Sequence, residues 1–126
     1  MKTIITTDKA HSDIGQYSQA NLANGVLYIS GQIPINPETG KIEEGIKEGT
    51  HQVMKNLQAV LDASGMSFRN VVKATIFLKN MDDFSEMNEI YASYLEEGFY
   101  PARECVQVSC LPKNVEVEIS MIAHQD

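Results

Sequence analysis

The sequence predicts an α+β fold in which two helices cover one face of a β-sheet. Three observations support this class. Several short segments rich in β-branched residues resemble strands, two longer segments carry apolar residues at helical spacing, and Gly, Pro and Asn separate them. The predicted order is β-β-β-α-β-α-β-β, and we expect residues 1–126 to form a single domain.

Three strands are predicted in the first part of the chain. A short strand is expected near Ile4. Residues 18–24 and 26–33 then flank the turn at Asn24-Gly25, a dipeptide that favours a β-hairpin. Residues 34–40 contain two prolines and a glycine, so we expect a loop there.

Two helices and another strand follow. Residues 45–64 form an amphipathic helical pattern that Gly65 ends, and residues 71–78 are apolar and β-branched, as in a strand. Asp82 and Asp83 are candidate N-caps for the second helix. Its predicted apolar face carries Phe84, Met87, Tyr91 and Leu95.

The last two predicted strands, 102–110 and 115–123, carry the residues on which the functional prediction depends. Side chains alternate between the two faces of a strand. We assign the apolar set of each strand to the helix-covered face, because the opposite choice would bury charges. Arg103 and Glu118 are then expected to share the face turned away from the helices. The residues predicted to join them there are Cys105, Gln107 and Ser120.

This predicted face has too few charges for an ordinary solvated surface and too many for a protein core. A contact between subunits would explain this composition, and ligand sites often lie in such clefts. The guanidinium of Arg103 presents a rigid fork of donors to a carboxylate or phosphate. The pattern therefore favours a site for a small anion. A surface ion pair of Arg103 with Glu104 or Glu118 is the alternative.

The composition disfavours several other functions. The net charge is −7, and no basic cluster or basic amphipathic segment indicates binding to nucleic acid or to a membrane. The N-terminal residues lack the apolar core of a signal peptide, so we expect a cytoplasmic protein. Cys105 and Cys110 would lie about 16 Å apart in an extended strand, too far for a disulfide. His11, His51 and His124 are scattered, so we expect no metal site.

Six short motifs stand out along the chain. They are Gly15-x-Tyr17-Ser18-Gln19-Ala20, Ser30-Gly31-Gln32-Ile33-Pro34, Val72-Lys73-Ala74-Thr75, Pro101-Ala102-Arg103-x-Cys105-Val106, Leu111-Pro112-Lys113 and Val117-Glu118-Ile119. In this order they resemble the motifs of the Rid family, also called the YjgF family, of reactive imine and enamine deaminases. The similarity extends from about Gly15 to Ala123, which is nearly the whole chain.

The resemblance implies a fold, an assembly and a reaction. The fold is a chorismate-mutase-like (YjgF-like) α+β sandwich, and the assembly is a homotrimer with active sites in the clefts between subunits. The implied reaction uses no cofactor and hydrolyses 2-iminobutanoate and 2-iminopropanoate to 2-oxo acids and ammonia. Removing these reactive imines protects pyridoxal-phosphate enzymes from damage.

The resemblance also assigns catalytic roles to Arg103, Glu118 and Tyr17. Arg103 would hold the substrate carboxylate. Glu118 would position or deprotonate the attacking water, and proximity to Arg103 should favour its ionised form. Tyr17 would close the pocket from the N-terminal loop. The alternatives are a structural ion pair between Arg103 and Glu118, and a packed aromatic side chain at Tyr17.

Four further residues are expected at the pocket. Cys105 would contact the substrate, and we do not expect it to act as a nucleophile. Ser30 and Gly31 follow a predicted strand, and Gly31 would let its backbone N–H approach a ligand; a bulge or bend is the alternative. Asn88 is a polar residue beside an apolar helical stripe, so we expect it to make a structural hydrogen bond at the pocket edge.

The chain departs from the family pattern at three places. Gln16 replaces a proline, Ser109-Cys110 replaces a common Ala-Arg pair, and Glu104 adds a negative charge beside Arg103. None of these changes removes a catalytic group, although each could shift the substrate preference. The alternative to an enzyme is a non-catalytic trimer that binds small carboxylates and has a regulatory or chaperone-like role.

Overall fold

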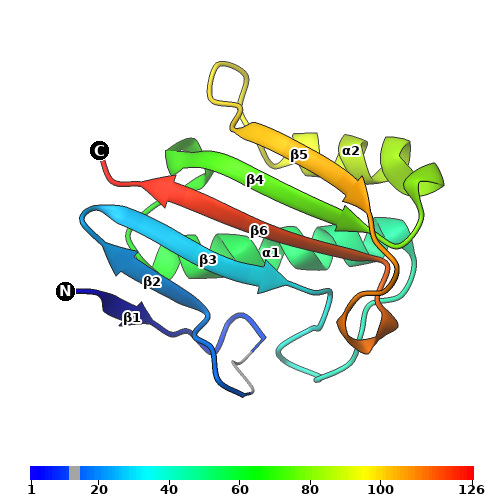
Figure 1. The fold of residues 1–126 in the computed structure, drawn as a ribbon, viewed down its shortest axis with the longest axis horizontal. Coiled ribbons are helices and arrows are strands. Elements are labelled where there is room, and N and C mark those ends of the chain that lie inside the picture. Colours follow the sequence, from blue (N-terminus) through cyan, green and yellow to red (C-terminus); the bar gives the residue numbers. More distant parts are fainter. Residues whose placement is uncertain (12–14) are drawn as a thin grey trace.

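The structure, a computed structural model, describes residues 1–11 and 15–126. Six strands of this described part form one sheet: β1 (Thr3–Ile5), β2 (Ala20–Ala23), β3 (Val26–Gln32), β4 (Val71–Leu78), β5 (Ala102–Gln107) and β6 (Val117–His124). Their order across the sheet is β1-β2-β3-β6-β4-β5 (Figure 1). Neighbouring strands run antiparallel, except that β4 and β5 are parallel.

Two helices, α1 (Ile46–Ala63) and α2 (Phe84–Ser93), lie on the same face of the sheet (Figure 1). Three short 3₁₀ turns, Phe68–Asn70, Met81–Asp83 and Pro112–Asn114, occur in the connections. The predicted fold class and element order are therefore confirmed. In the described ranges, no helix has the length and apolar character needed to span a membrane.

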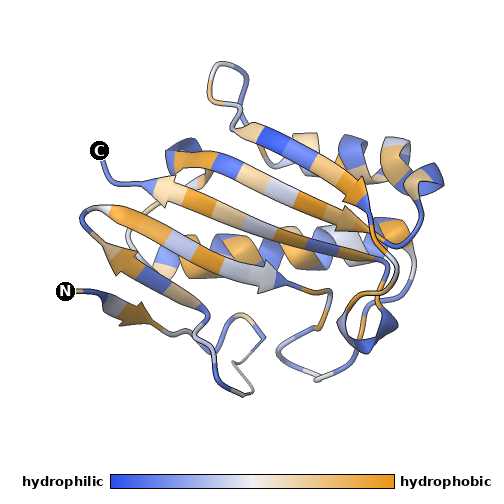
Figure 2. Cartoon of the chain, viewed as in Figure 1, coloured by the Kyte–Doolittle hydropathy of each residue, from blue (hydrophilic) through white to orange (hydrophobic). Residues whose placement is uncertain are grey.

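The main core lies between the sheet and the helices. Alternate residues of the central strands are buried on this side, and the hydropathy of β6 alternates accordingly (Figure 2). The strand residues of this core include Leu27, Ile29, Ala74, Ile76, Leu78, Val117, Ile119, Met121 and Ala123. They pack with residues of α1 and α2 that include Val53, Met54, Leu57, Val60, Leu61, Met87 and Tyr91. Burial of this apolar surface provides the main driving force for folding.

The turns predicted at Asn24-Gly25 and Gly65 are present. Asn24 and Gly25 have φ angles of 51° and 77°, which suit the tight hairpin between β2 and β3. Gly65 has a φ angle of 71°, and the N–H of Met66 donates to the carbonyl of Leu61 at 2.9 Å. This arrangement ends α1 and satisfies a carbonyl of its last turn.

The start and end of α2 differ in part from the prediction. The side chain of Asn80 accepts a hydrogen bond from the N–H of Asp82 at 2.9 Å and caps the 3₁₀ turn before the helix. Asp83 is the N-cap of α2, as predicted, but its side chain makes no capping hydrogen bond. The helix ends at Ser93, and Leu95 therefore lies beyond it.

The predicted face of β5 was also wrong. In the parallel pairing, Arg103 lies beside Ala74 and Cys105 lies beside Ile76. Ala74 and Ile76 are buried on the helix side, so their partners point to that side as well. The prediction placed Arg103, Cys105 and Gln107 on the open face, which is the face turned away from the helices. That face instead carries Ala102, Glu104 and Val106 of this strand.

The position of β5 at the edge of the sheet explains this difference. Only Cys105 is partly buried in this strand, and the side chain of Val106 remains 46% exposed. Arg103 and Glu104 are adjacent hydrophilic residues, so the hydropathy of β5 does not alternate cleanly (Figure 2). Burial of the apolar set therefore did not determine which face of this strand meets the helices.

Candidate active site

A hollow of about 510 Å³ lies beside the end of β3 and the start of β6. Four of the predicted site residues line it: Tyr17, Ser30, Gly31 and Glu118. The structure thus brings together residues that are far apart in the sequence. The other lining residues are His11, Gln19, Gln32, Ile33, Pro112 and Lys113.

Gly31 is required here by a close approach of Glu118. The pairing of β3 with β6 shifts register between Ile29 and Gln32, which confirms the bulge considered as the alternative for Gly31. A Cβ atom at Gly31 would lie 2.8 Å from Cδ of Glu118 and nearer still to one carboxylate oxygen. Real Cβ atoms do not approach so closely, so any larger residue would displace the carboxylate.

The carboxyl group of Glu118 is half-buried, and this burial raises its pKa above the usual value. The ion pairs formed among the described residues do not include Glu118. The expectation that Arg103 of the same chain favours the ionised form was therefore wrong. Within one chain, burial therefore shifts the equilibrium of Glu118 toward the protonated form, relative to an exposed carboxyl group.

Gln19 fixes the segment that carries Tyr17, and the sequence prediction missed this role. Its side chain is 2% exposed. It donates to the carbonyls of Thr7 and His11 at 3.0 and 2.7 Å and accepts from the N–H of Thr7 at 2.7 Å. Ser30 adds a bond from Oγ to the carbonyl oxygen of Ser18 at 2.6 Å. Tyr17 itself remains 48% exposed beside the hollow.

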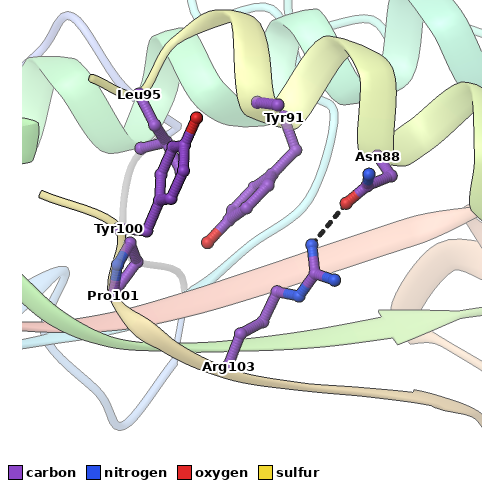
Figure 3. Close-up of a pocket in the computed structure, with 7 residues that line it drawn as sticks. Asn88, Tyr91, Leu95, Tyr100, Pro101 and Arg103 are labelled. Carbon is purple, nitrogen blue, oxygen red and sulfur yellow. Dashed lines mark hydrogen bonds between the residues drawn. The ribbon is translucent and has the colours of Figure 1, made fainter. Parts of the chain in front are cut away.

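Arg103 lies in a second hollow, of about 390 Å³, between α2 and the segment that leads into β5. Its Nη1 donates a hydrogen bond to Oδ1 of Asn88 (Figure 3). The guanidinium also lies 5.3 Å from the ring centre of Tyr91 and 5.5 Å from that of Phe84. These contacts orient the planar group, and its remaining N–H groups can serve a ligand.

Cys105 lies on the same side of β5 as Arg103 and packs against the main core. Burial raises the pKa of its thiol, and the nearby charge of Arg103 opposes this rise only in part. The protonated thiol is therefore favoured, and a thiol is a weak nucleophile. This environment suits a packing role for Cys105, which is not among the residues that line the two hollows.

The two hollows of one chain do not form a single site. Arg103 points to the helix side of the sheet, whereas Glu118 pairs with Phe77 and points to the open face. Strand β4 separates the strands that carry them. The alternative ion pairs of Arg103 with Glu104 and Glu118 are not formed among the described residues. Glu104 pairs with Lys73 at 2.9 Å, and Glu118 lies on the opposite face of the sheet.

Tyr91 and Lys113 are two lining residues to which sequence reasoning gave no role at the site. The ring of Tyr91 faces the guanidinium of Arg103, and its hydroxyl group is buried without a hydrogen-bond partner in the described structure. Burial raises the pKa of this phenol. Lys113 lines the Glu118 hollow from a backbone with a φ angle of 55°. Tyr91 was expected only in the core, because its spacing fits an apolar helical stripe.

The fold and the two hollows define an α+β protein in which the cation of Arg103 and the carboxyl group of Glu118 lie in separate hollows. The family described as Endoribonuclease L-PSP matches residues 7–125. The chain therefore belongs to this family, the RutC/Rid (YjgF/L-PSP) family.

Individual relatives agree with this assignment. A RutC family protein of Pyrococcus horikoshii is 50% identical over 127 residues, which cover 100% of both proteins. The human 2-iminobutanoate/2-iminopropanoate deaminase is 43% identical over 126 residues, which cover 99% of this chain and 91% of the human protein. A crystal structure of Escherichia coli TdcF with bound serine superimposes with a TM-score of 0.93 and 35% identity, and the match covers 98% of this chain and 99% of TdcF.

Proposed function

We propose that this protein is a cofactor-independent deaminase that hydrolyses 2-iminobutanoate and 2-iminopropanoate to 2-oxo acids and ammonia. One observation carries the proposal: a single chain presents an oriented cation in one hollow and a half-buried carboxylate in another. The first suits the carboxylate of a 2-imino acid, and the second suits its attacking water. The human relative bears the name of this activity.

The proposed active site forms between two copies of the chain in a homotrimer. Arg103 and Glu118 point to opposite sides of one sheet, so one copy alone does not present both to the same small molecule. A cyclic assembly repeats one contact between unlike surfaces. In such a contact the Arg103 hollow of one copy meets the Glu118 hollow of the next.

The residues take the following roles in the proposed reaction. Arg103 binds the substrate carboxylate with the N–H groups that Asn88 leaves free. Glu118 of the neighbouring copy accepts a proton from water while the water oxygen bonds to the imine carbon. Glu118 returns this proton to the imine nitrogen, which gives a carbinolamine. The hydroxyl proton of the carbinolamine then passes to the nitrogen, the C–N bond breaks, and ammonia leaves as the C=O bond of the 2-oxo acid forms.

Glu118 must be ionised to accept this proton. Burial raises its pKa in a single chain. A guanidinium from the neighbouring copy would favour the carboxylate and so oppose this rise. The proposed assembly therefore supplies the cation that one chain does not place beside Glu118.

Four further residues complete the proposed site. Tyr17 covers the Glu118 hollow, and its hydroxyl group lies near the imine or the water. Ser30 and Gly31 offer polar and backbone groups at the bulge, and Cys105 lies on the same side of β5 as Arg103. The net charge of −7 disfavours a role in binding RNA, despite the ribonuclease in the family's name.

A coupled assay tests this function. A threonine dehydratase generates the imine, and we expect the purified protein to speed release of 2-oxobutanoate above the uncatalysed rate. Arg103→Ala should reduce kcat/KM for imine hydrolysis by at least about 100-fold, because two hydrogen bonds to a charged group are lost. Arg69→Ala is the matched control, since Arg69 is an exposed arginine paired with Glu96.

Two outcomes of this assay would contradict the proposal. In the first, the protein does not accelerate 2-oxobutanoate release. In the second, Arg103→Ala retains the wild-type rate. Calorimetry then tests the alternative of a non-catalytic protein. Binding of 2-oxobutanoate without turnover of the imine would indicate a carboxylate-binding protein that is not an enzyme.

A further inference from the structure

The hollow beside Arg103 extends past the guanidinium along α2. Beyond Arg103 and Asn88, its walls are mainly apolar (Figure 3). The lining residues of this part are Tyr91, Ala92, Leu95, Tyr100 and Pro101. The lining of the Glu118 hollow is also largely apolar, and its polar and charged side chains are His11, Gln19, Gln32, Lys113 and Glu118 among others. Arg103 in one hollow and Glu118 in the other distinguish the two.

Tyr91 provides a second, independent observation. Its side chain is 4% exposed, and its hydroxyl group has no hydrogen-bond partner among the described residues. Figure 3 shows this hydroxyl pointing into the space between Arg103 and the Tyr100-Pro101 segment. A buried hydroxyl without a partner is unfavourable, so this group is suited to bind an atom that enters the hollow.

The proposed reaction fixes the direction in which the substrate side chain must point. Arg103 holds the carboxylate, and Glu118 of the next copy directs water to the imine carbon. The third substituent on that carbon must avoid both groups. The apolar hollow of the Arg103 copy is the space beside the guanidinium that can receive it.

We infer that this hollow is the subsite for the substrate side chain and that it accepts 2-imino acids with side chains longer than ethyl. The preferred side chain is apolar along its length and carries one hydrogen-bond acceptor for the Tyr91 hydroxyl. Ala92, Leu95 and Tyr100 contact its apolar part. This inference rests on the proposed function, from which it takes the orientation of the substrate.

Binding of stable 2-oxo acids, the products of the reaction, tests the subsite by calorimetry. We expect 2-oxohexanoate to bind at least about tenfold more tightly than 2-oxopropanoate, because its longer chain fills an apolar hollow. Ala92→Phe should abolish this difference by occupying the hollow. Glu89→Phe is the matched control, since Glu89 is an exposed residue of the same helix and does not line the hollow.

A matched pair of ligands tests the hydroxyl of Tyr91. 4-Methoxy-2-oxobutanoate has the shape of 2-oxohexanoate but carries an ether oxygen. We expect it to bind the wild-type protein about 2- to 10-fold more tightly, the contribution of one neutral hydrogen bond. Tyr91→Phe keeps the ring against Arg103 and should remove this advantage.

Three results would overturn the subsite. The first is equal affinity for 2-oxohexanoate and 2-oxopropanoate in the wild-type protein. The second is a preference for the longer acid that survives Ala92→Phe. The third is dissociation of the oligomer by Ala92→Phe but not by Glu89→Phe, which would mean that a neighbouring copy fills the hollow.

The same experiments separate the subsite from the proposed function. Acceleration of imine hydrolysis without side-chain discrimination would contradict the subsite and leave the deaminase intact. Discrimination among 2-oxo acids without acceleration of hydrolysis would support the subsite and contradict the deaminase.

Discussion

Arg103 is a cation whose orientation is fixed before any ligand binds. Asn88 accepts one of its N–H bonds, and the rings of Tyr91 and Phe84 flank the guanidinium. A group held in this way loses little further freedom on binding, which favours affinity for a small anion. The carboxylate-binding role proposed for Arg103 therefore depends on α2 as much as on β5.

Glu118 gives the first prediction, on stability as a function of pH. Burial raises its pKa, so between the usual and the raised pKa the folded protein binds more protons than the unfolded chain. Stability then falls as pH rises through this interval. Glu118→Gln should increase the unfolding temperature at neutral pH, and this increase should disappear below pH 4.5. Thermal unfolding at both pH values measures the effect.

The background and the control of this experiment follow from the proposed assembly. Thermal unfolding is compared with and without Glu118→Gln, and both proteins also carry Arg103→Ala. This background is needed because Arg103 of a neighbouring copy would lower the pKa of Glu118. Glu97→Gln, at an exposed carboxylate, is the control. The prediction is contradicted if Glu118→Gln leaves the unfolding temperature at neutral pH unchanged or lowers it. Burial would then not disfavour the charge of Glu118.

The motifs identified these residues but not their surroundings. The sequence placed Arg103, Glu118, Tyr17 and Gly31 among the candidate residues, and the structure assigns them to two hollows. The close approach of Glu118 to Gly31 depends on a bulge between β3 and β6. Such a register shift is set by pairing with a distant strand, so local residue spacing does not reveal it.

At the scale of the elements, the central strands were predictable, whereas the orientation of the edge strand β5 was not. The bounds of β4 agree with the predicted strand, because both its neighbours and the helices restrict its pattern. β5 pairs only with β4 and is exposed on most positions. Without burial on one face, alternation alone does not fix its orientation, and the placement of Arg103, Cys105 and Gln107 beside Glu118 was wrong for this reason.

The helix α1 gives the second prediction. Gly49 lies within this helix, and a Cβ atom there would meet its nearest neighbour, the carbonyl oxygen of Glu43, at 3.5 Å. This is an ordinary contact, so Gly49→Ala should raise the free energy of unfolding by about 0.5–1 kcal/mol through its better helix propensity. Urea unfolding measures this change.

A second glycine at the start of α1 provides the control. Gly45 has a φ angle of 88°, which an alanine adopts only with strain. Gly45→Ala should therefore lower the free energy of unfolding. The account of α1 would be contradicted if Gly49→Ala were the more destabilising of the two substitutions.

At the scale of the whole molecule, the open sheet face remains partly apolar. Tyr28 and Val106 on this face are 49% and 46% exposed, and Phe77, which pairs with Val106, is partly buried. The sequence predicted a subunit interface from the composition of this face. The structure adds that Arg103 and Glu118 lie on opposite sides of the sheet. This separation favours a site that is assembled from different copies of the chain.

Activity of mixed oligomers tests this central claim most directly. Arg103→Ala and Glu118→Gln should each be nearly inactive alone. When the two variants are unfolded, mixed in equal amounts and refolded together, one intact site can form wherever Arg103 of one copy meets Glu118 of another. Random mixing predicts recovery of about a quarter of the wild-type deaminase activity. A mixture no more active than the two separate variants would contradict a site shared between copies.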